Sequence, residues 1–342
     1  MCPRDIQERT DKNVATSSTS RMASLPVVVV VDVDPDWRTP GMRRKPYLGD
    51  LGWKGVSEGI PRLLRLISDI KDPQSNPVRF TWLLRSDRQM AELTGNPTYV
   101  ADEFNELWRA RLAAGDEIGW HPHLWRYSER ARVWYQETRD QDWMRECLRE
   151  GHRALAQRFS IRTAKTGWTQ HDNLTMRTFS DLGVEVDISA LPGMRYANTI
   201  PGTDLPLGSY DWSRAPQEPY FPSTHDYQIP GNGHSLDVLE VPNWTFPVRG
   251  LRHHLRRLRN RSWRDFANAA KSPTLVSEGF THPPTTVPFA CYFHPEELIG
   301  PEPMFRAGHV ATNLRTLLAA CQDRGLVPRM MTASQLRGWP SL

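Results

Sequence analysis

The chain has 342 residues, 39% of them hydrophobic, and a net charge of +4 from 43 basic and 39 acidic side chains. This size suits one large α/β domain or two small ones. No nucleic-acid recognition motif accompanies the mild positive charge, and no apolar run approaches the roughly 18 residues of a membrane span.

The amino-terminal segment and the cysteines point to an intracellular protein. Residues 1–24 are polar, rich in Ser and Thr, and lack the apolar stretch of a secretory signal. We therefore predict a disordered tail over 1–24, one domain over 25–342 and a cytoplasmic location, with Met22 as an alternative start to Met1. The four cysteines are scattered without a C-x-x-C pair, which argues against a disulfide framework and favours a reducing compartment.

The first expected element is a buried strand that ends in acid. Five valines in a row, Val27 to Val31, are typical of a parallel strand covered on both faces. Asp32, Asp34 and Asp36 follow at once, and unpaired carboxylates are too costly to bury in a core. The strand is therefore expected to open onto a site at its carboxyl end, although an acidic surface turn is the simpler alternative.

Strands and helices are expected to alternate along the rest of the chain. Further strands are predicted at 78–84, 116–120, 162–166, 184–188, 236–241, 287–293 and 326–330. Helices are predicted at about 60–70, 100–113, 141–158, 172–182, 249–270 and 308–323. The segment 190–235 is rich in Pro, Gly, Tyr and Ser and is expected to be a long ordered insertion without a helix. This alternation predicts an α/β fold, a distorted (β/α)7 barrel in a single domain with one long loop insertion.

Polar residues gather just after the predicted strand ends. They are Asp32, Asp34, Arg85, Asp87, His121, His123, Arg162 and His294. In a β/α barrel the carboxyl ends of the strands meet on one face, which is where active sites lie. This convergence favours a functional site over the simple acidic turn.

The pair His121 and His123 has the spacing of two metal ligands on one strand face. Residues i and i+2 of an extended chain point the same way, about 6.6 Å apart, and Pro122 favours extended geometry at His121. Two imidazoles and one carboxylate form many hydrolytic zinc sites. Asp32 and Asp34 share a face in the same way, so one could bind the ion while the other acts as general base. Two histidines on a surface loop are the alternative.

Several segments together resemble the polysaccharide deacetylase family, which is carbohydrate esterase family four, from about residue 26 to 330. They are Val-Asp-Val-Asp-Pro-Asp at 31–36, Asp-Glu-Ile-Gly-Trp-His-Pro-His at 116–123, Leu-Gly-Val-Glu-Val-Asp-Ile-Ser at 182–189 and Tyr-Phe-His-Pro-Glu-Glu at 292–297, with Arg162 opening a strand. The resemblance implies a seven-stranded β/α barrel with a divalent metal. It also implies roles: Asp32 as base, Asp34 and His121 as metal ligands, Arg162 as the residue that orients the base, and His294 as acid.

The chain departs from the family pattern at two places. The family's second metal histidine stands four positions after the first, and this position is Trp125. Either His123 replaces it as the third metal ligand, or the metal shell is incomplete. The arginine motif also lacks its usual prolines and reads Arg162-Thr163-Ala164-Lys165.

Substrate contacts are predicted on loops that follow strand ends. Trp37, Trp168 and Trp244 are candidates for stacking on sugar rings, or they pack their own loops. Arg85 and Asp87 are candidates for substrate binding, or they pair with each other. The basic run 249–264 is expected on an amphipathic helix with a solvated face, or alternatively to contact an acidic partner or a membrane surface.

These features predict a hydrolase of carbohydrate metabolism that cleaves a non-peptide C–N bond with a divalent metal. Deacetylation of an N-acetylated sugar or sugar conjugate is favoured, with zinc ahead of cobalt, nickel or manganese. One alternative is a small-molecule amidohydrolase for a ring amide or ureido substrate, since some relatives of this kind need no metal. Another is a catalytically silent relative that binds carbohydrate. The sequence predicts neither the substrate's identity nor the oligomeric state.

Overall fold

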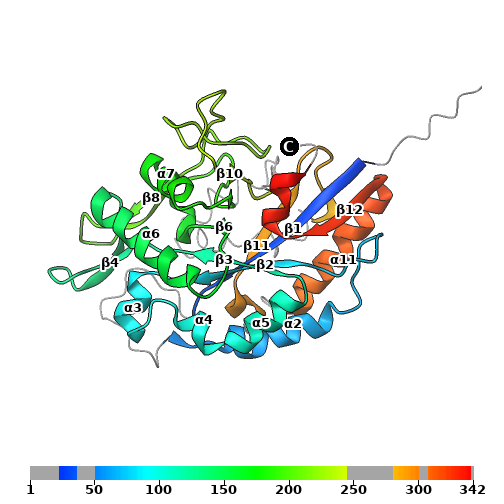
Figure 1. The fold of residues 1–342 in the computed structure, drawn as a ribbon, viewed down its shortest axis with the longest axis horizontal. Helices are drawn as coiled ribbons and strands as arrows, with labels where there is room; N and C mark the ends of the chain where they lie inside the picture. Colours follow the sequence, from blue (N-terminus) through cyan, green and yellow to red (C-terminus); the bar gives the residue numbers. More distant parts are fainter. Residues whose placement is uncertain (1–22, 37–50, 245–279, 300–306, 340–342) are drawn as a thin grey trace, which may run out of the picture.

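The computed structural model describes residues 23–36, 51–244, 280–299 and 307–339 (Figure 1). Several predicted features lie outside these ranges: residues 1–22 of the tail predicted over 1–24, Trp37, the basic run 249–264 and the helix expected at 249–270. Ala23 and Ser24, which the sequence assigned to the tail, are the first residues of strand β1.

A curled parallel sheet of eight strands forms the centre of the molecule (Figure 1). Its strands are β1 (Ala23–Val33), β2 (Phe80–Arg85), β3 (Glu117–His121), β6 (Thr163–Ala164), β7 (Val186–Asp187), β10 (Leu239–Glu240), β11 (Phe289–Phe293) and β12 (Leu326–Met331). Seven of them follow the order β10-β7-β6-β3-β2-β1-β11, while β12 pairs with the first half of β1. Beyond β10, the backbone N–H of Trp244 donates to the Ala290 carbonyl of β11 at 2.8 Å. The predicted distorted (β/α)7 barrel is confirmed.

Helices lie around the outside of the sheet (Figure 1). The α-helices are α2 (Ile60–Leu66), α3 (Arg88–Thr94), α4 (Tyr99–Glu103), α5 (Asn105–Ala113), α6 (Gln141–Ala156), α7 (Asn173–Asp181) and α11 (Ala307–Asp323). Shorter turns are the π-helical η1 (Gly55–Gly59) and the 3₁₀ segments η2 (Gly167–Thr169), η4 (Pro295–Leu298) and η5 (Ala333–Gly338). The helix predicted at 100–113 is divided at Phe104. Asp172 caps α7 as predicted, because its carboxylate accepts the Thr175 N–H.

Strand β1 explains the run of five valines from Val27 to Val31. Val27 to Val31 are completely buried; all five pair with β11, while Val27 and Val28 also pair with β12 and Val29 to Val31 with β2. A strand with neighbours on both edges and covered faces needs apolar side chains on both faces, which an unbroken β-branched run supplies. The run ends where the barrel opens, at Asp32.

Two hairpins extend from the barrel. The first pairs β4 (Trp125–Ser128) with β5 (Val133–Gln136), and the second pairs β8 (Arg195–Thr199) with β9 (Pro206–Asp211) inside the insertion 190–235. In the part of the chain that the structure describes, no helix has the length and apolarity needed to cross a bilayer.

Replacing Gly55 with alanine should destabilise the fold by about 1–3 kcal/mol, as overpacking does. A methyl group there would lie 2.4 Å from the Pro295 carbonyl carbon and 2.5 Å from the Glu296 nitrogen, and neither backbone atom can turn aside. Urea denaturation of Gly55→Ala measures the effect. Gly308→Ala is the matched control, because a methyl group on Gly308 meets nothing within 4 Å. Equal midpoints for the two variants would contradict the expected clash.

Candidate functional site

The carboxyl ends of five neighbouring strands bring the candidate residues together. Register places Arg85 of β2 opposite His121 of β3, and Val31 of β1 opposite Phe293 of β11. His294 follows Phe293 directly, and Lys165 follows β6. The group formed in this way comprises Asp32, Asp34, Arg85, His121, His123, Lys165 and His294.

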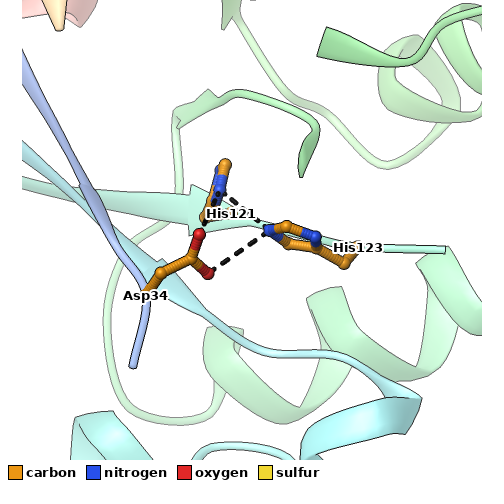
Figure 2. A group of neighbouring side chains, drawn as sticks. All are labelled: Asp34, His121 and His123. Carbon is orange, nitrogen blue, oxygen red and sulfur yellow. Dashed lines mark hydrogen bonds and ion pairs between the residues drawn. The ribbon is translucent and has the colours of Figure 1, made fainter. Parts of the chain in front are cut away.

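Three of these residues form a compact set of candidate metal ligands. Figure 2 shows the Asp34 carboxylate facing both imidazole rings. The two Nε2 atoms of His121 and His123 lie 3.1 Å apart, and Asp34 lies 3.3 Å from His123 Nε2 and 3.8 Å from His121 Nε2. Ligands about 2.0–2.2 Å from a tetrahedral zinc ion are separated by similar distances. Their chemistry and spacing fit a divalent first-row metal.

The chain itself orients His121 so that Nε2 faces the other two candidate ligands. Its Nδ1 lies 2.7 Å from the Lys165 carbonyl oxygen, which can only accept, so Nδ1 carries the proton. The Nε2 lone pair then points toward Asp34 and His123. A backbone carbonyl behind a histidine ligand is a common way to fix this tautomer.

His123 is buried and neutral, with contacts on both sides of its ring. Burial and the nearby Arg85 charge lower the pKa of His123 to about 4, although Asp34 acts in the opposite direction. The Trp125 indole N–H donates to its Nδ1 at 2.7 Å. On the other side, a Cβ on Gly167 would lie 2.3–2.4 Å from the His123 ring, so this position requires glycine.

Arg85 connects Asp34 with Asp87. Its guanidinium donates to Asp34 Oδ1 at 3.2 Å and to Asp87 Oδ2 at 2.8 Å, and all three side chains are buried. Asp87 also caps α3 through the Met90 N–H at 2.9 Å and accepts the His123 N–H at 3.2 Å. Arg85 and Asp87 therefore pair with each other, one of the two alternatives that the sequence left open. Burial raises the pKa of Asp34, but His123, His121 and Arg85 together hold it well below its usual range.

Asp32 has one oxygen held and one oxygen open. The Lys165 ammonium contacts Oδ2, and His294 Nε2 lies 3.5 Å from the same atom. Oδ1 is buried and has no hydrogen-bond partner among the described residues. Burial acts to raise the pKa of Asp32, but the Lys165 charge, with further contributions from the neighbouring His121 and His294, holds it below its ordinary value. The carboxylate is thus ionised at neutral pH, with Oδ1 free to accept a proton.

Lys165, and not Arg162, contacts Asp32, for which the resemblance implies the role of base. The structure places Arg162 at the surface, where its guanidinium donates to Glu185 at 2.9 and 2.6 Å. Arg162 precedes β6 and so lies at the amino end of the strand, while the site lies at the carboxyl ends. Lys165 follows β6, is 2% exposed and has its Nζ 3.8 Å from the centre of the Tyr292 ring. Sequence reasoning missed Lys165, although its position directly after a strand was a usable signal.

His294 lies between Asp32 and Glu297. Its backbone N–H donates to Glu297 Oε2 at 3.1 Å, and its Nδ1 lies 3.7 Å from Glu297 Oε1. The imidazole is partly exposed, at 14% for the side chain. A histidine that contacts carboxylates on two sides and also reaches solvent can exchange a proton with a bound substrate.

The predicted substrate tryptophans have different positions. Trp168 of η2 lies beside the site, with its ring centre 6.2 Å from that of Trp125 and 6.1 Å from that of Tyr196. Trp244 is partly buried and packs against the core. Trp37 lies outside the described residues.

No protein-family model matches the chain, and neither does any curated protein. Among solved structures, a candidate glycoside hydrolase/deacetylase from Parabacteroides distasonis is 12% identical with a TM-score of 0.51, covering 93% of this chain and 71% of its own. A candidate polysaccharide deacetylase from Mycobacterium smegmatis is 16% identical with a TM-score of 0.49, covering 94% and 91%. A family 4 carbohydrate esterase from Streptomyces lividans, solved with acetate, is 10% identical with a TM-score of 0.39, covering 92% and 95%. The chain therefore shares the fold of the first of these, the deacetylase-like β/α barrel that the sequence resemblance implies.

Proposed function

We propose that this chain is a hydrolase of an acyl C–N bond and that it removes the acetyl group from an N-acetylated sugar or sugar conjugate. One observation carries the proposal. Asp32 presents an open, buried oxygen in the same group of side chains as the metal-ligand set Asp34, His121 and His123. A base and a metal-ligand set side by side are what metal-assisted hydrolysis requires.

In this proposal each residue has a stated task. Asp34, His121 and His123 would hold the divalent ion, which when bound supplies a Lewis acid for the acyl oxygen and an acidified water. Asp32 would accept a proton from the attacking water at Oδ1, while Lys165 keeps Oδ2 in place. His294 gives a proton to the departing amine, so that acetate and a free amine leave.

A second candidate is a metal-free amidohydrolase, and the charge balance of the site favours it. Lys165 contacts Asp32, and Arg85 pairs with Asp34, so each buried carboxylate already has a cation from the chain. Such a site tolerates its carboxylates without an ion. The substrate would then be a ring amide or ureido compound, as the sequence alternative stated.

Metal content separates these candidates. We expect about one zinc, cobalt, nickel or manganese ion per purified chain, since three convergent ligands form such a site. His123→Ala should lose the ion, because one of three ligands is removed. His309→Ala is the control, since His309 is exposed on α11 and far from these ligands in sequence. Elemental analysis of the three proteins after reconstitution gives the answer.

The reaction is tested on the same samples. Acetate release from N-acetylated hexosamines and their oligomers, with metal present, supports the deacetylase. Ammonia or ring opening from cyclic amides and ureides without metal supports the second candidate. A chain that binds carbohydrate but hydrolyses neither class would be the silent relative that the sequence also allows.

A further inference from the structure

Trp125 stands where the family resemblance places a metal ligand, and its indole contacts His123. Trp125 is 5% exposed, and its ring stacks near that of His123 with an interplanar angle of 22° and centres 6.2 Å apart. The indole N–H lies 2.7 Å from His123 Nδ1. An indole N–H can only donate, so His123 Nδ1 must accept and carries no proton.

This contact determines the proton on the other nitrogen. A neutral imidazole has one N–H, so His123 carries it on Nε2, the atom that faces Asp34 and His121. His121 has the opposite tautomer, because its Nδ1–H donates to the Lys165 carbonyl. The result is a continuous chain of bonds, from Trp125 to His123, from His123 Nε2–H to His121 Nε2, and from His121 to Lys165.

The tautomer of His121 therefore leaves the Nε2 lone pair available for a metal ion, whereas the tautomer of His123 places a proton on Nε2. To coordinate through Nε2, neutral His123 must move its proton to Nδ1. Two N–H groups would then face each other at the distance of the present bond. The indole must turn away before the ligand set is complete.

We propose that Trp125 is a positioning residue that holds His123 in the Nε2–H tautomer and thereby couples metal binding to movement of the indole. The inference rests on the metal site proposed above. Residues behind a metal-bound histidine ordinarily strengthen binding, and their loss weakens it about 10- to 100-fold. Here the effect on metal affinity is the opposite, because Trp125 disfavours the His123 tautomer that can coordinate through Nε2.

The zinc affinity of Trp125→Phe tests whether Trp125 weakens metal binding. Phenylalanine keeps an aromatic ring but cannot donate, so zinc should bind about 10-fold more tightly than to wild type, in a competition titration with a chelator. Trp82→Phe is the matched control. It also removes a buried indole donor, whose partner is Asp116 at 2.8 Å at the amino ends of the strands, and it should leave zinc affinity unchanged. Equal or weaker zinc binding by Trp125→Phe would overturn the proposal.

The tautomer itself is measurable in wild-type protein freed of metal. With ¹⁵N-labelled histidine, long-range ¹H–¹⁵N spectra should show His123 protonated at Nε2 and His121 at Nδ1, with signals assigned from single alanine variants. A proton on His123 Nδ1 would refute the proposal even if Trp125→Phe fails to fold. This measurement needs no substrate, so it also separates failure of this inference from failure of the proposed hydrolysis.

Discussion

Asp32→Asn should lower turnover about 10³-fold, within the range that a general base contributes. Asparagine keeps the shape of the side chain but cannot take a proton at the atom that Asp32 Oδ1 occupies. That oxygen is a buried acceptor with no hydrogen-bond partner among the described residues, while Oδ2 is held by Lys165. The measurement is kcat at saturating concentration of the best substrate from the hydrolysis screen.

Metal content gives the second readout for Asp32→Asn. Asp32 does not belong to the ligand set Asp34, His121 and His123, so the variant should retain its metal. Asp69→Asn is the control, since Asp69 forms an exposed ion pair with Arg315 at 2.8 Å. Turnover within about 10-fold of wild type, below the usual contribution of a base, would remove Asp32 from that role.

Arg85→Met should cost about 3–5 kcal/mol of unfolding free energy, which is typical when one partner of a buried ion pair is removed. Arg85 is 4% exposed and contacts both Asp34 and Asp87. Two buried carboxylates would remain without their cation. Chemical denaturation in the absence of metal measures the loss.

Added zinc should restore part of that stability. An ion bound by Asp34, His121 and His123 would neutralise one of the two carboxylates, and a ligand that binds only the folded state raises stability by mass action. Arg158→Met is the control, because its pair with Asp102 is partly exposed and such pairs contribute about 0–1 kcal/mol. A loss for Arg85→Met as small as that of the control would show that Asp34 and Asp87 are tolerated without Arg85.

The sequence predicted the barrel and which residues gather at its carboxyl end, because both depend on short-range patterns. The valine run indicates a buried parallel strand, and residues after such strands meet on one face, as Asp32, His121 and His294 do. The spacing of His121 and His123 likewise follows from the period of an extended chain. Each inference needed only a local rule and the topology of the barrel.

Arg162 and Lys165 show where a transferred role fails. The family resemblance assigned the orienting role to the residue that opens the strand, but an opening residue lies at the amino end. Lys165, three positions later, lies at the carboxyl end of the same strand and contacts Asp32. The strand itself is only Thr163–Ala164, so a small error of register moves a side chain from one end of the barrel to the other.

The Trp125 contact could not be predicted from spacing. Trp125 opens the β4–β5 hairpin and lies two residues after His123, and this spacing alone does not fix the hydrogen bond between the indole and the imidazole. The pairing of Arg85 with Asp34 is similar, because the two residues are 51 positions apart and meet only through the register of β1 and β2. Such contacts arise from tertiary packing and leave no local pattern.

The strands that carry the candidate site differ in length, so one side of the site has many backbone pairings and the other has few. Asp32 follows five valines paired to strands on both edges, whereas Lys165 follows a two-residue strand beside two others of equal brevity. Subglobal opening begins where pairing is sparse and reaches densely paired strands last. A transient detachment on the β6–β7–β10 side would withdraw the ammonium from Asp32 while the carboxylates stayed in position. Local opening of these strands would thus raise the proton affinity of Asp32 reversibly, without global unfolding.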